Sequence, residues 1–289
     1  MPHASPPIGI VGAGAVATAL GGRLHAAGAP VVALASRTLP AARRAAAAIG
    51  PSVQVVSCTA LPHHVQRVIV AVTDDGIGPV AATLATAGMR GIVLHTSGAR
   101  GLAPCEPLRA VGVACGMLHP LQTVVPRERG ATSFSGVAFG VAGDGPACGW
   151  ARALVGQLGA EVLELCADDL AAYHAGAVMA SNALTAAIDA ALALLVQAGI
   201  ERDAALRALG PLCRASIENA LELGPAGALT GPVVRGDAST IAAHLNALGR
   251  APGSVEALYR ATGRHLLSLA RERQLPPAAA RSIGRLLEA

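Results

Sequence analysis

Lysine is missing from this chain of 289 residues. All 22 residues in the combined lysine and arginine count are arginine. A Schiff-base lysine, a phosphate-loop lysine and an ammonium group acting as acid, base or substrate anchor are therefore excluded. The side chains that carry a fixed positive charge are all guanidinium groups.

Aromatic residues are also scarce, with two Tyr, two Phe and one Trp. So few rings leave little for bases to stack on, which argues against nucleic acid as a partner. The net charge of +4 and the pI near 9.0 come from scattered arginines and not from a basic run. This distribution favours a small anionic substrate over a polyanion.

The six cysteines form no CxxC pair and have no histidine at metal-ligand spacing. We interpret them as free core thiols in a reducing compartment, and we expect a cytoplasmic protein without a metal site. The apolar segment 175–200 is long enough to span a bilayer. Because Asn182, Asp189 and Gln197 interrupt it, we interpret it as a buried helix of a protein that does not enter a membrane.

Short apolar runs alternate with alanine-rich helical stretches in the first half of the chain. The runs cover residues 8–11, 31–35, 53–56, 68–72, 92–94, 111–114, 137–141 and 162–165. Continuous apolar strands separated by helices predict a doubly wound parallel sheet covered on both faces. After Leu165 only helical periodicity follows. We therefore predict an α/β domain over 1–166 and an all-α domain over 167–289.

The first apolar run opens a glycine-rich loop of the form G-x-G-x-x-A. Gly12 permits the tight turn, and Gly14 lets the backbone approach a pyrophosphate. The small Ala17 lets the following helix lie close to the sheet, with the amides of Ala15 and Val16 facing the phosphates. A turn of small residues in an alanine-rich chain is the alternative. The position of the loop at the first strand favours a Rossmann dinucleotide site.

The end of the second apolar run carries the residues that select the cofactor. An NAD site has an acidic residue there for the ribose hydroxyls, but this chain has Ser36, Arg37 and Thr38. Two hydroxyls and a guanidinium suit a 2′-phosphate. We therefore predict NADP, with a surface arginine at the start of a helix as the alternative.

Polar residues end three further strands, at the edge where open α/β sheets bind ligands. Val72 and Thr73 end one strand, and Thr96 and Ser97 end the next. The two latter hydroxyls can donate to substrate or to the nicotinamide ribose, or can cap a turn. His119 lies just after a predicted strand and before a proline. Its ordinary pKa near neutrality makes it a candidate proton donor, and a structural histidine is the alternative.

The helical half supplies three candidates for the substrate site. His174 and Asn182 lie on one predicted helix, Asn182 about 80° round and ~12 Å along from His174. We expect this asparagine to be buried and to bind the carboxamide, a substrate or a neighbouring helix. Arg235 can clamp a carboxylate, or can pair with Asp237.

Together these motifs resemble the 6-phosphogluconate dehydrogenase-like NADP-binding superfamily, and within it Rossmann-like proteins with an uncharacterised helical C-terminal domain. The resemblance implies a helical domain that forms a homodimer and a cofactor cleft between the domains. It rests on residues 12–17, 95–99, 119–123, His174 with Asn182, and 230–237 followed by His244.

Better-known relatives suggest chemistry. Ketopantoate reductases and 3-hydroxyacid dehydrogenases place a catalytic lysine four residues before an asparagine. If Asn182 matches that asparagine, the lysine position is Val178. Prephenate dehydrogenases resemble the chain at His119 and Ser97, and pyrroline-5-carboxylate reductases share the architecture.

We therefore predict an NADPH-dependent reductase of a small carboxylate-bearing carbonyl or imine. In this prediction His119 donates the proton or polarises the carbonyl, Ser97 and Asn182 orient the ligands, His174 lies nearby and Arg235 holds the carboxylate. The alternatives are a non-catalytic NADP-binding sensor and an oxidative hydroxy-acid or prephenate-type dehydrogenase.

Overall fold

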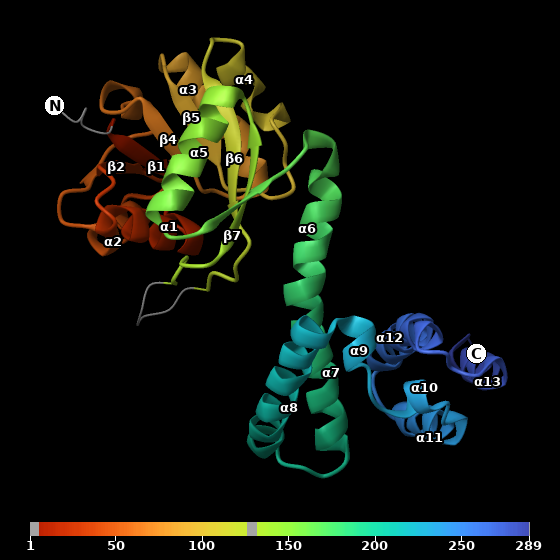
Figure 1. The fold of residues 1–289 in the computed structure, drawn as a ribbon. Helices are drawn as coiled ribbons and strands as arrows, with labels where there is room; N and C mark the ends of the chain where they lie inside the picture. The colour runs from red at the N-terminus through yellow and green to blue at the C-terminus, as the bar shows by residue number, and fades with distance from the viewer. Residues whose placement is uncertain (1–5, 126–131, 289) are drawn as a thin grey trace. The chain divides into compact units, whose positions relative to one another are not determined.

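The computed structural model describes residues 6–125 and 132–288. The chain divides into two compact units, Met1–Met179 and Ala180–Ala289. The first unit contains a mostly parallel sheet flanked by helices, and the second is helical (Figure 1). This confirms the predicted fold class. The proposed boundary at 166 lies after the last strand, a little before the point where the compact units divide.

Eight strands form one sheet in the order β3-β2-β1-β4-β5-β6-β7-β8. They are β1 Ile8–Val11, β2 Val31–Ala35, β3 Gln54–Val55, β4 Arg67–Val70, β5 Ile92–His95, β6 Ala114–Pro120, β7 Ala138–Gly143 and β8 Glu161–Glu164. Strands β6 and β7 pair antiparallel, so β7 and β8 run against the other six. The prediction of a wholly parallel sheet is wrong here. The described parts of the β6–β7 connection contain no crossover helix, which a parallel pair would need.

Helices cover both faces of this sheet. Leu20, Ile49 and Leu154 pack on one face, whereas Ile77 and Leu84 pack on the other. Burial on both faces explains why the strands read as continuous apolar runs. The helices of this unit are α1 Ala15–Ala26, α2 Leu39–Ile49, α3 Asp74–Thr86, α4 Glu106–Arg109, α5 Gly145–Gln157 and α6 Leu170–Val178, with 3₁₀ turns η1 Leu61–His63, η2 Ala103–Cys105 and η3 Ala167–Asp169.

Strand β6 differs from its prediction in a way that matters for the site. The apolar run that begins at Val111 forms a turn, in which Gly112 has a φ of 82°, and the strand starts only at Ala114. It continues through Pro120, so His119 lies within the strand and not after it. The alternation of a strand puts His119 and Met117 on the same face of the sheet.

One helix runs continuously over Leu170–Gln197. It consists of α6, a π-helical segment η4 at Met179–Ala183, and α7 at Leu184–Gln197. It is long and apolar enough to cross a membrane, and only 6% of its most apolar window is buried within the chain. The expectation of a buried helix is therefore wrong for the single chain, because little of this apolar window is buried among the described residues.

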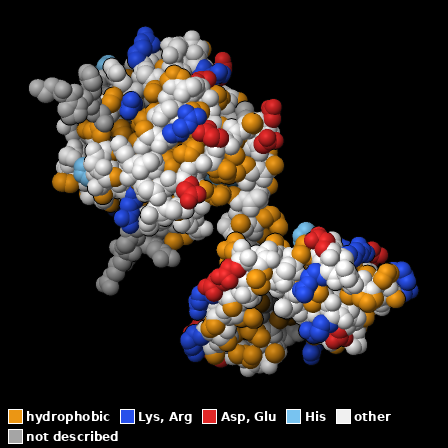
Figure 2. All heavy atoms as spheres, in the orientation of Figure 1, with side chains coloured by type: hydrophobic (Ala, Val, Ile, Leu, Met, Phe, Trp, Pro, Cys, Tyr) orange, Lys and Arg blue, Asp and Glu red, His pale blue; other side chains and the backbone are white. Residues whose placement is uncertain are grey.

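The helical unit packs around its own core. The main cluster includes Ile241, Leu267, Ile283 and Leu287, and a smaller cluster joins α7 to α8. Apolar side chains also appear on the visible surface of this unit (Figure 2). Leu221 of α8 is 82% exposed. The remaining helices are α8 Arg202–Leu223, α9 Pro225–Ala228, α10 Pro232–Arg235, α11 Ala238–Leu248, α12 Gly253–Glu272 and α13 Pro277–Glu288.

Candidate functional site

The glycine-rich loop joins β1 to α1. Gly12 has a φ of 130°, and a side chain there would collide with the Ala71 carbonyl oxygen. Gly14 has open space where a Cβ would stand, and it caps α1 without any side-chain hydrogen bond. The first backbone amides of α1 therefore lie beside open space, and Gly14 places no side chain there. This geometry fits a pyrophosphate at a helix N-terminus.

A cavity of about 1050 Å³ lies at this loop. Its size is at the upper end of the range of ligand pockets, which is about 300–1,000 Å³. All ten residues that the sequence singles out for cofactor binding line it. They are Gly12, Gly14, Ala15, Val16, Ser36, Arg37, Thr38, Val72, Thr73 and Thr96. Ser97 lines the same cavity.

The rim of the cavity at the end of β2 is cationic and hydroxylated. Ser36 is half-buried, and Arg37 and Thr38 are exposed at the start of α2. The acidic residues that line the cavity, Asp74 and Asp75, belong to the start of α3 and not to the end of β2. The residues present therefore fit an adenosine ribose that carries a phosphate.

The loop after β5 is held by Ser97. Its Oγ accepts hydrogen bonds from the backbone amides of Ala99 at 3.3 Å and Arg100 at 3.1 Å. Arg100 in turn pairs with Asp75 at 3.0 Å and with Asp74 at 3.6 Å. Turn capping, the alternative role for Ser97, thus exists in the structure. The Ser97 hydroxyl proton remains available to a ligand, because both bonds use the oxygen as acceptor.

His119 packs between this loop and α6. A side chain at Gly98 would stand 2.8 Å from the His119 ring, so the imidazole lies against bare backbone. The His119 Nδ1 is 2.8 Å from the Tyr173 hydroxyl, and the two rings meet edge-on with centroids 5.5 Å apart. His174 approaches the other edge, with centroids 5.9 Å apart. The sequence gives no role to Tyr173, although its place beside His174 was a usable signal.

The pKa of His119 differs from that of a free histidine. Burial, and secondarily His174, lower its pKa to about 4, and Asp74 only partly opposes this. Burial raises the pKa of the Tyr173 hydroxyl. At neutral pH the imidazole is therefore uncharged and the phenol is protonated. The pKa lies below that of a free histidine because this ring is in a desolvated place beside a second histidine.

His95 is a further buried imidazole, at the end of β5. It is 0% exposed, and neither ring nitrogen has a hydrogen-bond partner among the described residues. Burial lowers its pKa to about 4, against smaller opposing effects of Gly101 and Asp74. His95 also lowers the pKa of His119. Sequence reasoning assigned no role to it, although it immediately precedes the Thr96–Ser97 pair.

The candidates in the helical unit have simpler surroundings. Asn182 lies in the π-helical segment and is exposed, and its Oδ1 accepts from the Ser181 hydroxyl at 2.9 Å. The predicted burial is wrong, and the angle calculated for a regular α-helix does not apply across a π turn. Arg235 is exposed, and no ion pair between it and Asp237 occurs in the described ranges. Hydrogen bonds from Thr240 and Ser239 lower the pKa of Asp237, and the charge of Arg235 adds only the smallest contribution.

Two known domains match the sequence. Residues 2–120 match the Rossmann-like domain, and residues 137–266 match DUF2520, a domain of unknown function. Among curated proteins none matches.

Solved structures share the fold of nearly the whole chain. A Bacteroides fragilis protein provisionally assigned as an NADP oxidoreductase is 24% identical, with a TM-score of 0.74 over 90% of this chain and 97% of that one. Protein TM1727 of Thermotoga maritima is 20% identical, with a TM-score of 0.72 over 93% and 100%. Pyrroline carboxylate reductase of Plasmodium falciparum, solved with NADP bound, is 12% identical, with a TM-score of 0.57 over 98% of each chain. An N-terminal match to the Rossmann-like domain followed by a match to DUF2520 is the combination that the sequence resemblance predicts.

Proposed function

We propose that this protein is an NADPH-dependent reductase of a small carbonyl or imine substrate that bears a carboxylate. One observation carries the proposal: the loop that contributes Thr96 and Ser97 to the dinucleotide-sized cavity also contains Gly98, against which the His119 ring packs. A polarising group therefore lies beside the place where a nicotinamide cofactor would bind. The similarity of the fold to a pyrroline carboxylate reductase with NADP bound supports it.

Arg37 supports NADP over NAD. Its guanidinium, with the hydroxyls of Ser36 and Thr38, would hold a 2′-phosphate at the rim of the cavity. The α1 amides beside Gly14 would hold the pyrophosphate. Val72, Thr73 and Thr96 line the remainder of the cavity toward the sheet edge. When bound, NADPH would supply a hydride to the substrate, and the proton that completes the alcohol or amine would come from solvent.

His119 acts in this proposal as an uncharged hydrogen-bond donor. A ring with a pKa of about 4 cannot serve as an imidazolium acid at neutral pH. With the Tyr173 hydroxyl donating to Nδ1, the ring carries its proton on Nε2, where it can polarise a carbonyl or imine and stabilise the charge that develops. Tyr173 is then a positioning residue that fixes the tautomer and the plane of the ring.

Other side chains take supporting roles in the proposal. The Ser97 hydroxyl proton orients the substrate or the nicotinamide. Burial keeps His119 uncharged, and His174 adds to this because a second imidazole nearby opposes protonation. Asn182 and Arg235 of the helical unit are proposed to contact the ligand carboxamide and the substrate carboxylate respectively. Each is tested by its own alanine variant in the assay below.

The experiment is an assay of NADPH oxidation against a panel of 2-oxo acids and cyclic imines. The proposal predicts turnover with NADPH, weaker turnover with NADH, and a loss of about 10²–10³-fold in kcat for His119→Ala. The reverse reaction with hydroxy acids and NADP tests the oxidative direction. Tight NADPH binding without turnover in either direction would contradict the proposal and favour the non-catalytic sensor.

We further propose that the protein is a homodimer through its helical unit, in the cytoplasm. The apolar helix over Leu170–Gln197 is largely uncovered in the single chain, and large apolar side chains such as Leu221 are exposed on α8. Exposed apolar surface of this extent marks an interface. Light scattering on the purified protein would give twice the chain mass of 28.6 kDa. A monomer that co-floats with lipid vesicles would contradict the dimer and indicate a membrane contact.

A further inference from the structure

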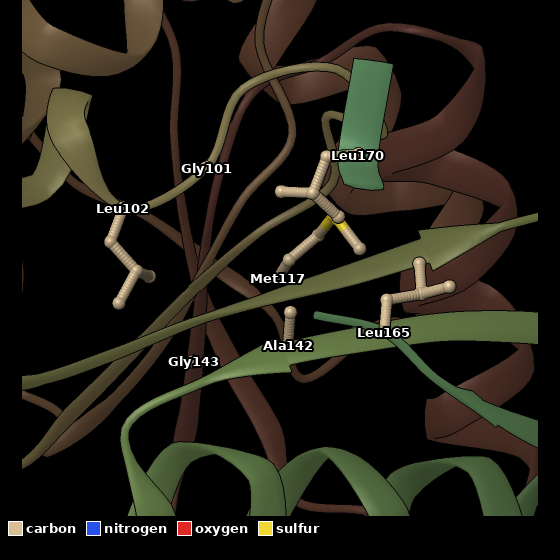
Figure 3. Close-up of a pocket in the computed structure, with 7 residues that line it drawn as sticks. All are labelled: Gly101, Leu102, Met117, Ala142, Gly143, Leu165 and Leu170. Carbon is tan, nitrogen blue, oxygen red and sulfur yellow. The ribbon is translucent and has the colours of Figure 1, made fainter. Parts of the chain in front are cut away.

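A second, smaller cavity lies in the first unit. Its volume is about 190 Å³. Met117 and Ala142 project into it from the neighbouring strands β6 and β7, and Leu170 at the start of α6 faces them (Figure 3). The other lining residues are Gly101, Leu102, Gly143 and Leu165. None of these seven side chains is polar, so the cavity suits a hydrocarbon group.

The cavity adjoins the His119–Tyr173 pair. Met117 and His119 lie two residues apart on the same face of β6, which is about 7 Å along a strand. On β7 their register partners are Ala142 and Gly140. A side chain at Gly140 would meet both the Tyr173 hydroxyl and the Leu165 side chain. Leu165 therefore packs against Gly140, as the Tyr173 hydroxyl does, and it also forms a wall of the cavity.

The cavity also adjoins the cofactor site through one loop. Thr96 and Ser97 line the large cavity, and Gly101 and Leu102, four to five residues further, line the small one. Gly98, which contacts the His119 ring, lies between the two pairs in the chain. The beginning of this loop therefore borders the cofactor cavity, and its end borders the apolar cavity. A small molecule held at His119 would lie near both cavities.

We infer that this cavity is the specificity pocket for the apolar side chain of the substrate. This inference rests on the proposed function and narrows it: the substrate is a carbonyl or imine carboxylate with a compact aliphatic or phenyl group of about four to six carbons. The size supports this, since an apolar cavity of about 150 Å³ holds benzene. Substrates with a charged side chain are disfavoured, because no side chain of the lining is polar or carries a compensating charge.

The test measures binding separately from turnover. Isothermal titration of the NADPH-loaded protein with propionate, butyrate and hexanoate should show affinity rising about fourfold for each added methylene. Ala142→Leu fills the cavity and should abolish that rise, with propionate affinity unchanged. Ala138→Leu, on the same strand and the same face but outside the lining, is the matched control. Leu102→Ala enlarges the cavity and should extend the preference to octanoate.

The outcomes distinguish the inference from the function on which it rests. The pocket is supported if the affinity of the wild type rises with chain length, if Ala142→Leu removes this rise, and if Ala138→Leu keeps it. This holds even if no 2-oxo acid or imine of the panel is reduced. Three results would contradict the assignment of the pocket. They are absence of hexanoate binding, equal affinities of the wild type for the three carboxylates, and equal effects of the two leucine variants. Turnover of a panel of 2-oxo acids without chain-length dependence would leave the reductase intact and remove the pocket alone.

Discussion

The Nδ1 of His119 on β6 lies 2.8 Å from the hydroxyl of Tyr173 on α6. The two residues are far apart in the sequence, and the bond links the sheet edge to the first turn of the long helix. Burial lowers the pKa of the imidazole and raises that of the phenol, so both side chains are uncharged at neutral pH. The hydrogen bond between them therefore joins two neutral groups. The pair can therefore present a neutral N–H donor at neutral pH.

Tyr173→Phe should reduce kcat by about tenfold or more while the KM for NADPH stays unchanged. The variant removes the partner that fixes the His119 tautomer, and this kind of supporting bond is typically worth 10–100-fold. The chain offers a matched control in its helical unit, where the Nδ1 of His244 lies 2.8 Å from the Tyr259 hydroxyl. Tyr259→Phe removes an equivalent bond and should leave kcat unchanged. Equal kcat values for the two variants would contradict a role for Tyr173.

Gly98→Ala should lower kcat at little cost in NADPH affinity. The new methyl group would stand 2.8 Å from the His119 ring, which must then turn or shift. A displacement of this kind in a catalytic group can cost about 100-fold in rate. Gly112→Ala is not a suitable control, because its φ of 82° adds strain, whereas Gly145 has open space around it. Gly145→Ala should therefore have wild-type kcat, and a fully active Gly98→Ala would remove the ring from the reaction.

Arg37→Ala should raise the KM for NADPH by about 10–100-fold and leave the weaker NADH reaction unchanged. Charge-assisted hydrogen bonds of about 1.5–3 kcal/mol to the 2′-phosphate would be lost. Arg43 is exposed on α2, the helix that follows Arg37, but does not line the cavity, so Arg43→Ala is the control. Steady-state kinetics with both cofactors give the comparison. Parallel losses for NADPH and NADH would contradict selection by Arg37.

Acid should destabilise the protein through His95. The unfolded histidine has a pKa of about 6.5, whereas the buried one has a pKa of about 4. Between these values the unfolded chain binds more protons, so stability is full above about pH 6.5 and falls as the pH drops toward 4. The loss for this fully buried ring is about 3 kcal/mol. His95→Leu should flatten the pH dependence of thermal unfolding, whereas His64→Leu at an exposed site should not.

The cofactor-binding residues were predictable because each of them lies shortly after a strand that the sequence itself reveals. Gly12, Gly14 and Arg37 follow two strands whose apolar runs are unmistakable, and the cavity collects them at one sheet edge. The fold class followed from the same runs. The reversed direction of β7 was not predictable, since alternation of strand and helix carries no information on a connection without a helix.

The catalytic half was less predictable because its properties arise from packing. His119 was found from its motif, but its pKa depends on burial and on His174, neither of which the sequence reveals. Tyr173 joins the site only because α6 lies over β7 at Gly140. The apolar character of the helix over Leu170–Gln197 was read correctly, whereas its exposure depends on what covers it in the assembly.

The most direct measurement follows deuterium from NADPH into product. The protein is incubated with NADPH deuterated at C4, on either face in separate samples, together with the 2-oxo acid and imine panel, and products are analysed by mass spectrometry. We predict that the wild type transfers one deuterium from one face only, and that His119→Ala forms about 10²–10³-fold less labelled product. Tight binding of NADPH with no deuterium in any product from either face would contradict this prediction.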